Sequence, residues 1–276
     1  MAEPLISVKD LRVAFGGASG PIEVVRGISF DLGREKLGIV GESGSGKSLT
    51  GRSIMRLLPA GARLSASRIA FAGEDLQKAS ERRMEEIRGR GIGFIMQDPK
   101  YSLNPVVTVG EQIAEAYRLH VKASAATARE RAIAMLRTVQ IRDPERVFGM
   151  YPHEMSGGMG QRIMIAMMLV AEPQALIADE PTSALDVTVR LEILALLDDL
   201  VATRGLGLIF ISHDLNLVRR FCDRVLIMYR GRVVEELAAG DLGQATHPYT
   251  RGLLEALPRI HARRPRLPTM QRDPNW

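Results

Sequence analysis

The order of hydrophobic and polar positions along the chain predicts an α/β fold. Alternating residues predict β-strands at Ile6–Phe15 and 28–32, on either side of a turn at 16–21, and a further short strand at Arg68–Phe71. Three later apolar runs, each followed by polar residues, predict strands at 37–40, 175–178 and 208–211. Near-continuous apolar strands are buried on both faces, as in a parallel sheet, and ligands of such sheets collect where the strands end.

Helices are predicted between these strands. Residues 49–58 have a helical pattern, and residues 108–150 form a longer helical block. In this block Thr108 precedes Glu111 by three residues, which is the spacing of a capping box, and residues 125–140 predict a second helix. The chain therefore carries a helical segment between the predicted strands at 68–71 and 175–178.

The helical pattern changes after this block. Pro144 and Pro152 are expected to interrupt it. Residues 186–203 predict an amphipathic helix, with Gly205 just past its end. The apolar stripe of this helix is predicted to consist of Val187, Leu191, Leu194, Leu197 and Val201.

Length and composition narrow the class of protein. A chain of 276 residues suits one large α/β domain or a core with a subdomain. The longest apolar run, 163–171, is far shorter than the roughly 20 residues that cross a bilayer, and the N-terminus has no signal-segment pattern. Cys222 is the only cysteine, which excludes a disulfide framework and a cysteine-based metal cluster. We expect this cysteine to be buried and the protein to be cytosolic or peripheral to a membrane.

The net charge of +5 comes largely from the end of the chain. After Leu257 there are five arginines and one acidic residue, Asp273. This segment is interpreted either as a solvated tail or as a contact for anionic lipid or a partner. No basic patch interleaved with aromatic residues is present in the sequence, so we expect no nucleic-acid partner.

One segment matches the phosphate-binding pattern GxxxxGK[ST]. It consists of Gly41, Glu42, Ser43, Gly44, Ser45, Gly46, Lys47 and Ser48. Because it joins an apolar strand to a predicted helix, its backbone N–H groups and the helix N-terminus would point at phosphates. Lys47 is expected to reach the β- and γ-phosphates, and the Ser48 hydroxyl to hold Mg²⁺. The chain is therefore predicted to bind a nucleoside triphosphate.

Two further groups of residues suit a nucleotide site. Asp179 and Glu180 follow a buried strand; the first acid suits Mg²⁺, and the second is placed to orient and deprotonate the attacking water. Ser156, Gly157 and Gly158 open a strongly apolar helix and form a second anion-binding helix start. Two such helix starts in one chain make sense if each nucleotide lies between two subunits.

These residues resemble the ATP-binding subunit of an ABC transporter. Six motifs occur in the order and spacing of that family and cover roughly residues 5–240. They are the 41–48 loop (Walker A), Gln97 (Q-loop), Ser156-Gly157-Gly158 (signature), Asp179-Glu180 (Walker B with the catalytic glutamate), Ser183-Ala184-Leu185-Asp186 (D-loop) and His213 (switch histidine).

The resemblance implies a role for each matching residue. Glu180, His213 and Gln97 would be catalytic, and Ser48, Gln97 and Asp179 would bind Mg²⁺. ATP would be bound by the whole 41–48 loop, by Ser156, Gly157, Gly158 and Asp186, and by Phe15, whose ring would stack on adenine. Asp186 would also cap the helix that it starts, and Asp214 would cap a helix after His213.

The implied fold is that of an α/β P-loop NTPase with the RecA-like core of the ABC ATPases, an antiparallel β-subdomain and an inserted helical subdomain at about 100–160. The ABC ATP-binding domain would span 1–240, and residues 241–276 would form a C-terminal extension with the basic tail.

Finer features resemble importers for dipeptides, oligopeptides and nickel. These are the runs at 97–99, 102–105 and 247–251 and the signature form Ser-Gly-Gly-Met. The resemblance implies a second ATPase subunit, with a paralogue favoured over a second copy. It also implies two integral-membrane permeases, an indirectly acting periplasmic or extracellular binding protein, and a peripheral position on the cytoplasmic face of the inner membrane. Gly160 departs from the basic residue usual there.

The loop at 100–106 is expected to touch the permease through Tyr101 and Leu103, or else to pack on the helical subdomain.

Other functions remain open: a soluble ABC ATPase of repair, translation or the phosphonate lyase, and a P-loop kinase. A kinase has no use for the Ser-Gly-Gly helix start. Repair ATPases typically carry long coiled coils or zinc modules and the translation factors have two cassettes, and the sequence shows neither. The phosphonate-lyase ATPase therefore stays as the alternative to a transport motor.

Overall fold

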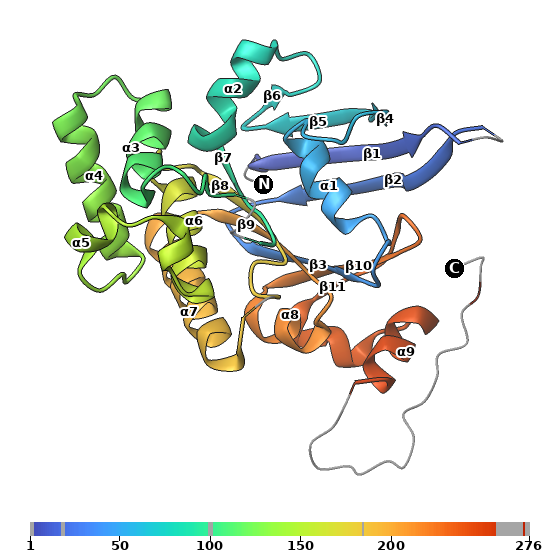
Figure 1. Ribbon diagram of the computed structural model, residues 1–276. Helices are drawn as coiled ribbons and strands as arrows, with labels where there is room; N and C mark the ends of the chain where they lie inside the picture. Colours follow the sequence, from blue (N-terminus) through green and yellow to red (C-terminus); the bar gives the residue numbers. More distant parts are fainter. Residues whose placement is uncertain (1–2, 18–19, 99–101, 184, 258–272, 274–276) are drawn as a thin grey trace. The chain divides into compact units, whose positions relative to one another are not determined.

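The computed structural model describes residues 3–17, 20–98, 102–183, 185–257 and 273 (Figure 1). The chain divides into two compact units. Unit 1 combines Met1–Gln77 with Ile209–Trp276, and unit 2 is Lys78–Leu208. Tyr101 and the five arginines of the basic tail lie outside the described residues.

Unit 1 contains an antiparallel sheet. Its order is β2-β1-β5-β6, with β4 also paired to β1. The strands are β1 (Ile6–Phe15), β2 (Ile22–Leu32), β4 (Ala62–Ser65), β5 (Arg68–Phe71) and β6 (Glu74–Asp75). The predictions of β1 and β5 are confirmed, but β2 begins at Ile22 and not at 28. Register shifts near Leu11 break the simple alternation of β2, which hid its first half from the sequence pattern.

Unit 1 also holds most of a second sheet, in which β3 and β10 run parallel. Its strands are ordered β11-β10-β3-β9, from β3 (Lys36–Gly41), β9 (Gly207–Ser212), β10 (Arg224–Tyr229) and β11 (Arg232–Ala238). β10 runs parallel to β3, with Val225 opposite Gly38, and forms a hairpin with β11. The helical elements of this unit are α1 (Lys47–Ile54), α8 (Leu215–Phe221), the 3-10 helix η3 (Ala239–Gln244) and α9 (Pro248–Glu255).

Helix α1 packs against both β1 and β3, so one helix joins the two sheets of this unit (Figure 1). It ends at Ile54, four residues earlier than predicted, because Arg56 takes a positive φ of 53° that no helix continues. Cys222, at the end of α8, is buried as expected, and burial raises the pKa of its thiol to about 12.

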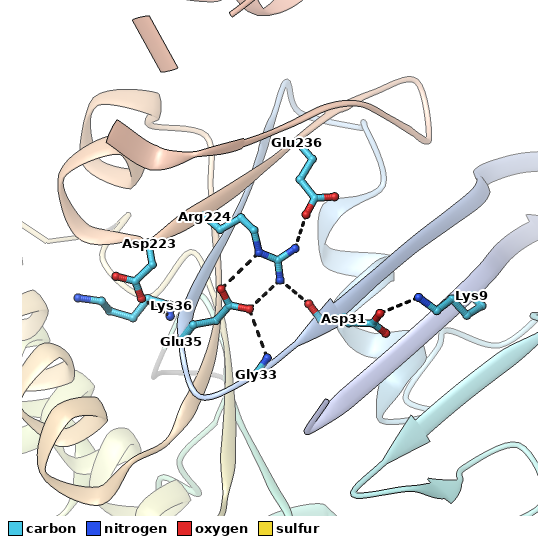
Figure 2. A network of polar contacts seen from close by, with 8 residues as sticks. All are labelled: Lys9, Asp31, Gly33, Glu35, Lys36, Asp223, Arg224 and Glu236. Carbon is cyan, nitrogen blue, oxygen red and sulfur yellow. Dashed lines mark hydrogen bonds and ion pairs between the residues drawn. The ribbon is translucent and has the colours of Figure 1, made fainter. Parts of the chain in front are cut away.

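Figure 2 shows the hydrogen bonds and ion pairs that Arg224, the first residue of β10, forms within unit 1. The Arg224 guanidinium donates to both carboxylate oxygens of Glu35, at 2.7 and 3.3 Å, and also to the Asp31 carbonyl and the Glu236 carboxylate. Burial raises the pKa of Glu35, but the hydrogen bonds from Arg224 and the Gly33 N–H outweigh it, so the net pKa lies below its usual value. This network joins the start of β10 to Asp31 of β2, to Glu236 of β11 and to Glu35, which comes just before β3.

Unit 2 combines two parallel strands with the helical block. β7 (Ile92–Ile95) pairs with β8 (Ala175–Asp179), with Ile92 opposite Ala175. Its helices are α2 (Glu81–Arg90), α3 (Val109–His120), α4 (Ala125–Thr138), α5 (Pro144–Phe148), the 3-10 helix η2 (Pro152–Glu154), α6 (Gly157–Leu169) and α7 (Val187–Arg204). α6 packs against α3, α4, β7 and α7, so the signature helix lies at the centre of this unit.

Caps and prolines set the boundaries of these helices. Thr108 caps α3 by accepting the Glu111 N–H at 3.4 Å, and the two side chains bond at 3.0 Å. α4 ends two residues before its predicted end at 140. Pro144 and Pro152 interrupt the helical pattern as expected, because α4 ends before the first and α5 before the second. Each proline is also the first residue of a new helix, α5 and η2, where proline needs no N–H partner.

The predicted apolar stripe of α7 is only half right. Val201, Leu197 and Leu194 are buried, but Val187 and Leu191 are 70% and 61% exposed. The buried set is completed by Ile193, Leu196 and Leu200 on the neighbouring positions. The core therefore covers the C-terminal part of α7 and leaves Val187 and Leu191, near its start, exposed.

Among the described residues, no helix combines the length and apolar character that crossing a membrane requires.

Candidate nucleotide-binding and catalytic site

The phosphate loop of unit 1 has the geometry that the motif needs. It starts where β3 ends, at Gly41, and leads into α1, with Gly46 as the N-cap in left-handed conformation. A Cβ at Gly41 would lie 2.2 Å from the Met228 carbonyl oxygen and 2.7 Å from Ser45 Oγ, so only glycine fits between the loop and β10. The sequence therefore folds the loop tightly against the end of the neighbouring strand.

Two side chains of the loop point into it. Lys47 is 5% exposed, and its Nζ donates to the carbonyl oxygens of Gly41 and Glu42, each at 2.9 Å. Within the described residues, the buried hydroxyl of Ser45 has no hydrogen-bond partner. A buried hydroxyl without a partner is uncommon and suits a site that a ligand oxygen or water completes. The loop thus offers a cation and an unused donor for a phosphate.

The other predicted residues of unit 1 lie at strand ends. Phe15 is the last residue of β1 and is half-buried, opposite Ile22 of β2. His213 is exposed and follows β9, and the next residue, Asp214, caps α8 by accepting the Leu217 N–H at 3.1 Å.

Sequence reasoning missed one residue at the loop. Tyr249 is fully buried in α9, and its hydroxyl accepts the Glu42 N–H at 3.2 Å. The 247–251 run pointed only to a subfamily. Its one aromatic residue among polar neighbours was the available signal.

Unit 2 brings together the predicted acids and Gln97. Asp179 ends β8 at 5% exposure, and Glu180 follows it with a φ of 48°, a conformation that costs energy for a residue with a side chain. Gln97 Nε2 lies 3.4 Å from Glu180 Oε2. The Ser183 N–H and hydroxyl both donate to the Glu180 carbonyl at 3.2 Å, so the turn after β8 holds the strained residue in place.

The signature residues start α6 as predicted. Ser156 is exposed and caps the helix by accepting the Met159 N–H at 3.4 Å. A Cβ at Gly158 would lie 2.6 Å from Val189 Cγ1, so glycine lets α6 approach α7. Asp186 caps α7 by accepting the Val189 N–H at 3.0 Å.

A cavity of about 350 Å³ connects the Q-loop and the signature within unit 2. Gln97, Ser156, Gly157 and Leu185 line it, and so does Gly160. The structure places Gln97, Glu180 and the signature in one unit and the phosphate loop, Phe15 and His213 in the other.

A glycine loop between a strand and a helix, together with a strand-ending acid pair, defines a P-loop nucleoside triphosphatase. The chain matches the family model described as "ABC transporter" over residues 25–183. It belongs to the ABC transporter family, it is an ATPase, and its predicted fold class is confirmed.

Individual relatives agree with this assignment. The chain is 50% identical to the probable peptide ABC transporter ATP-binding protein y4tR of Sinorhizobium fredii, over 97% of this chain and 81% of that protein. It is 47% identical to the dipeptide transport ATP-binding protein DppD of Bacillus subtilis, over 94% of this chain and 78% of that protein. Among solved structures, a dimer of the ATP-binding cassette MJ0796 with ADP and Pi superposes with a TM-score of 0.76 at 25% identity. That match covers 85% of this chain and 98% of the other.

Proposed function

We propose that the protein is the ATP-hydrolysing motor subunit of a binding-protein-dependent importer for peptides, nickel or a related small solute. The observation that carries this proposal is the similarity to ATP-binding proteins named for peptide transport, which extends over 97% of the chain and so includes the C-terminal extension. These relatives favour transport over the phosphonate-lyase alternative.

The proposed reaction is in-line attack of water on the γ-phosphorus of ATP. Glu180 takes a proton from the water, the new O–P bond forms, and the bond to the β–γ bridging oxygen breaks, giving ADP and phosphate. The hydrogen bond between Gln97 and Glu180 supports this role because it orients the carboxylate. His213 is proposed to sense the γ-phosphate.

The nucleotide-binding roles follow the predicted residues. The loop from Gly41 to Ser48 is proposed to hold the phosphates, with Lys47 as the cation and Ser45 as a hydroxyl donor. Phe15 is proposed to stack on adenine. The exposed helix start at Ser156, with Asp186 at the start of α7, is proposed to bind the ATP held by a second ATPase subunit.

Mg²⁺ is the proposed metal. Ser48, Asp179 and Gln97 carry hydroxyl, carboxylate and amide oxygens, the hard donors that this ion prefers. Such an ion would supply charge neutralisation at the phosphate oxygens.

The proposed partners are a second ATPase subunit, with a paralogue favoured, and two permeases fed by a solute-binding protein. The proposed place is the cytoplasmic face of the inner membrane. The ABC domain is proposed to span 1–240 with its helical insert at about 100–160, and no nucleic-acid partner is proposed.

The test is complementation of a strain that lacks the gene, with uptake of radiolabelled dipeptide, oligopeptide and nickel as the readouts. Wild-type protein should restore uptake of one solute class, and Glu180→Gln should not. Undiminished uptake of all three solutes in the deleted strain, together with lost growth on a phosphonate, would favour the lyase alternative. Co-purification of the permeases and the second ATPase from membranes would identify the partners.

A further inference from the structure

The C-terminal extension is anchored to unit 1 just before α9. The Glu235 carboxylate of β11 accepts the Thr246 N–H at 2.7 Å, the Thr246 hydroxyl at 3.1 Å and the His247 N–H at 3.2 Å. His247 then caps α9, and Pro248 is the first residue of this helix. These contacts fix the entry to α9 and so the direction of the residue that follows, Tyr249.

Tyr249 connects this extension to the phosphate loop. It is fully buried, and its ring lies against that of Tyr229 from β10, with 4.4 Å between the centroids. Its hydroxyl accepts the Glu42 N–H at 3.2 Å. A side chain 207 residues away in the sequence therefore holds the first peptide of the loop.

Three interactions meet at the backbone of Glu42. Its N–H donates to Tyr249, and its carbonyl accepts the Ser45 N–H at 3.2 Å and Lys47 Nζ at 2.9 Å. The first of these comes from the extension, the second closes the turn of the loop, and the third orients the phosphate-pairing lysine. The Gly231 N–H of the β10–β11 hairpin also donates to the Ser45 carbonyl at 3.1 Å.

We infer that Tyr249 is a positioning residue for the phosphate loop, through which the C-terminal extension keeps the loop in its nucleotide-binding conformation. The inference rests on the proposed role of this loop in binding ATP. Without the Tyr249 hydroxyl, the Glu42 N–H loses this hydrogen bond in a partly buried place, and the loop gains conformations that nucleotide binding must then remove. Tyr249 is not proposed to touch the nucleotide.

This arrangement predicts a defined kinetic signature. ATP and ADP both place phosphates in the loop, so both should lose affinity to a similar degree. A loss shared by ground state and transition state raises KM and leaves kcat nearly unchanged.

The experiment compares Tyr249→Phe with the matched control Tyr229→Phe in the full chain. Each variant removes one hydroxyl from the same ring pair, but the Tyr229 hydroxyl donates to the Asp273 carbonyl at 3.3 Å, whereas the Tyr249 hydroxyl accepts the Glu42 N–H. Tyr249→Phe should raise the dissociation constants of ATP and ADP about fivefold, as expected for one hydrogen bond. It should raise KM for ATP equally, and speed amide exchange in the 41–48 loop. Tyr229→Phe should do none of these.

Wild-type affinity in Tyr249→Phe would overturn the inference, as would equal losses in both variants or a fall in kcat alone. Lys47→Ala separates this failure from failure of the proposed site. If Lys47→Ala binds ATP as wild type does, the loop assignment is wrong and the inference falls with it. If only Lys47→Ala loses ATP, the loop assignment stands and the role of Tyr249 is rejected.

Discussion

Gln97 donates a hydrogen bond of 3.4 Å to the carboxylate of Glu180, although the two residues lie 83 positions apart in the sequence. The bond joins the segment after β7 to the turn after β8, and it lies at the end of a fully buried strand pair. A carboxylate that is to take a proton from water must be held in one orientation, and this amide provides such a constraint. Movement of the Gln97 segment would therefore change the orientation of the proposed base.

Glu180→Gln is expected to abolish turnover and retain ATP. The amide keeps the size of the side chain and an oxygen for Gln97, but it cannot take the proton from water. Phosphate release should fall below about a tenth of the wild-type rate, as expected for the loss of a general base. Size-exclusion chromatography with ATP and the second ATPase subunit should show a persistent dimer. Phosphate release above that level would contradict the assignment of Glu180.

Lys47→Ala and Ser156→Arg are expected to separate the two half-sites. Lys47→Ala should lose nucleotide binding by the isolated subunit, because it removes the cation that pairs with phosphate. Ser156→Arg should keep that binding but block ATP-dependent dimerisation through its bulk on the exposed start of α6. Ser156→Asn, which retains a capping side chain, controls for loss of the helix cap. Equal loss of monomer binding in Lys47→Ala and Ser156→Arg would be inconsistent with two half-sites.

Local motifs were predictable from the sequence because their geometry is local. The phosphate loop, the caps at Ser156 and Asp186, and the strand before Asp179 each depend on a few neighbouring residues. The contact between Tyr249 and Glu42 was not predictable, because it depends on how α9 folds back over 207 residues.

Burial patterns were predictable only where the core decides them. Helical periodicity shows which residues share a face, but not how far along the helix the core covers that face. Val187 and Leu191 were therefore assigned to the apolar stripe, although the buried part of α7 begins only at Ile193. Leu103 was expected either on a docking surface or packed on the helical subdomain, and its exposed fraction of 6% agrees with the second expectation. The neighbouring Tyr101 lies outside the described residues.

Val106→Asp is expected to weaken docking to the permease. Val106 is 78% exposed in the 100–106 loop, so it replaces Leu103 as the apolar residue available for a partner. A charge there should reduce recovery of the permeases with the subunit. It should leave ATP hydrolysis by the free subunit unchanged, because Val106 is exposed and is not one of the proposed catalytic or nucleotide-binding residues. Leu119→Asp is a matched control, since Leu119 is 74% exposed at the end of α3. Equal permease recovery with Val106→Asp and with wild type would reject docking through this position.

Glu35→Gln is expected to lower stability in a way that depends on pH. The folded state holds the pKa of Glu35 below its usual value of 4.5, because the hydrogen bonds from Arg224 and Gly33 outweigh the effect of burial. The stabilisation is therefore present above about pH 4.5 and is lost as the pH falls through the lowered pKa. The amide cannot form the charged bond at any pH. We expect the variant to unfold about 1 kcal/mol more easily at pH 7, a value reduced for partial exposure, and the difference from wild type to shrink on acidification. Urea unfolding at pH 7, 5 and 3 measures this difference in the free energy of unfolding.

Glu145→Gln, which removes an exposed ion pair with Arg137, is the control and should change stability by less than about 0.5 kcal/mol. If the free energies of unfolding of wild type and Glu35→Gln differ by the same amount across this pH range, the charge of Glu35 does not stabilise the start of β10.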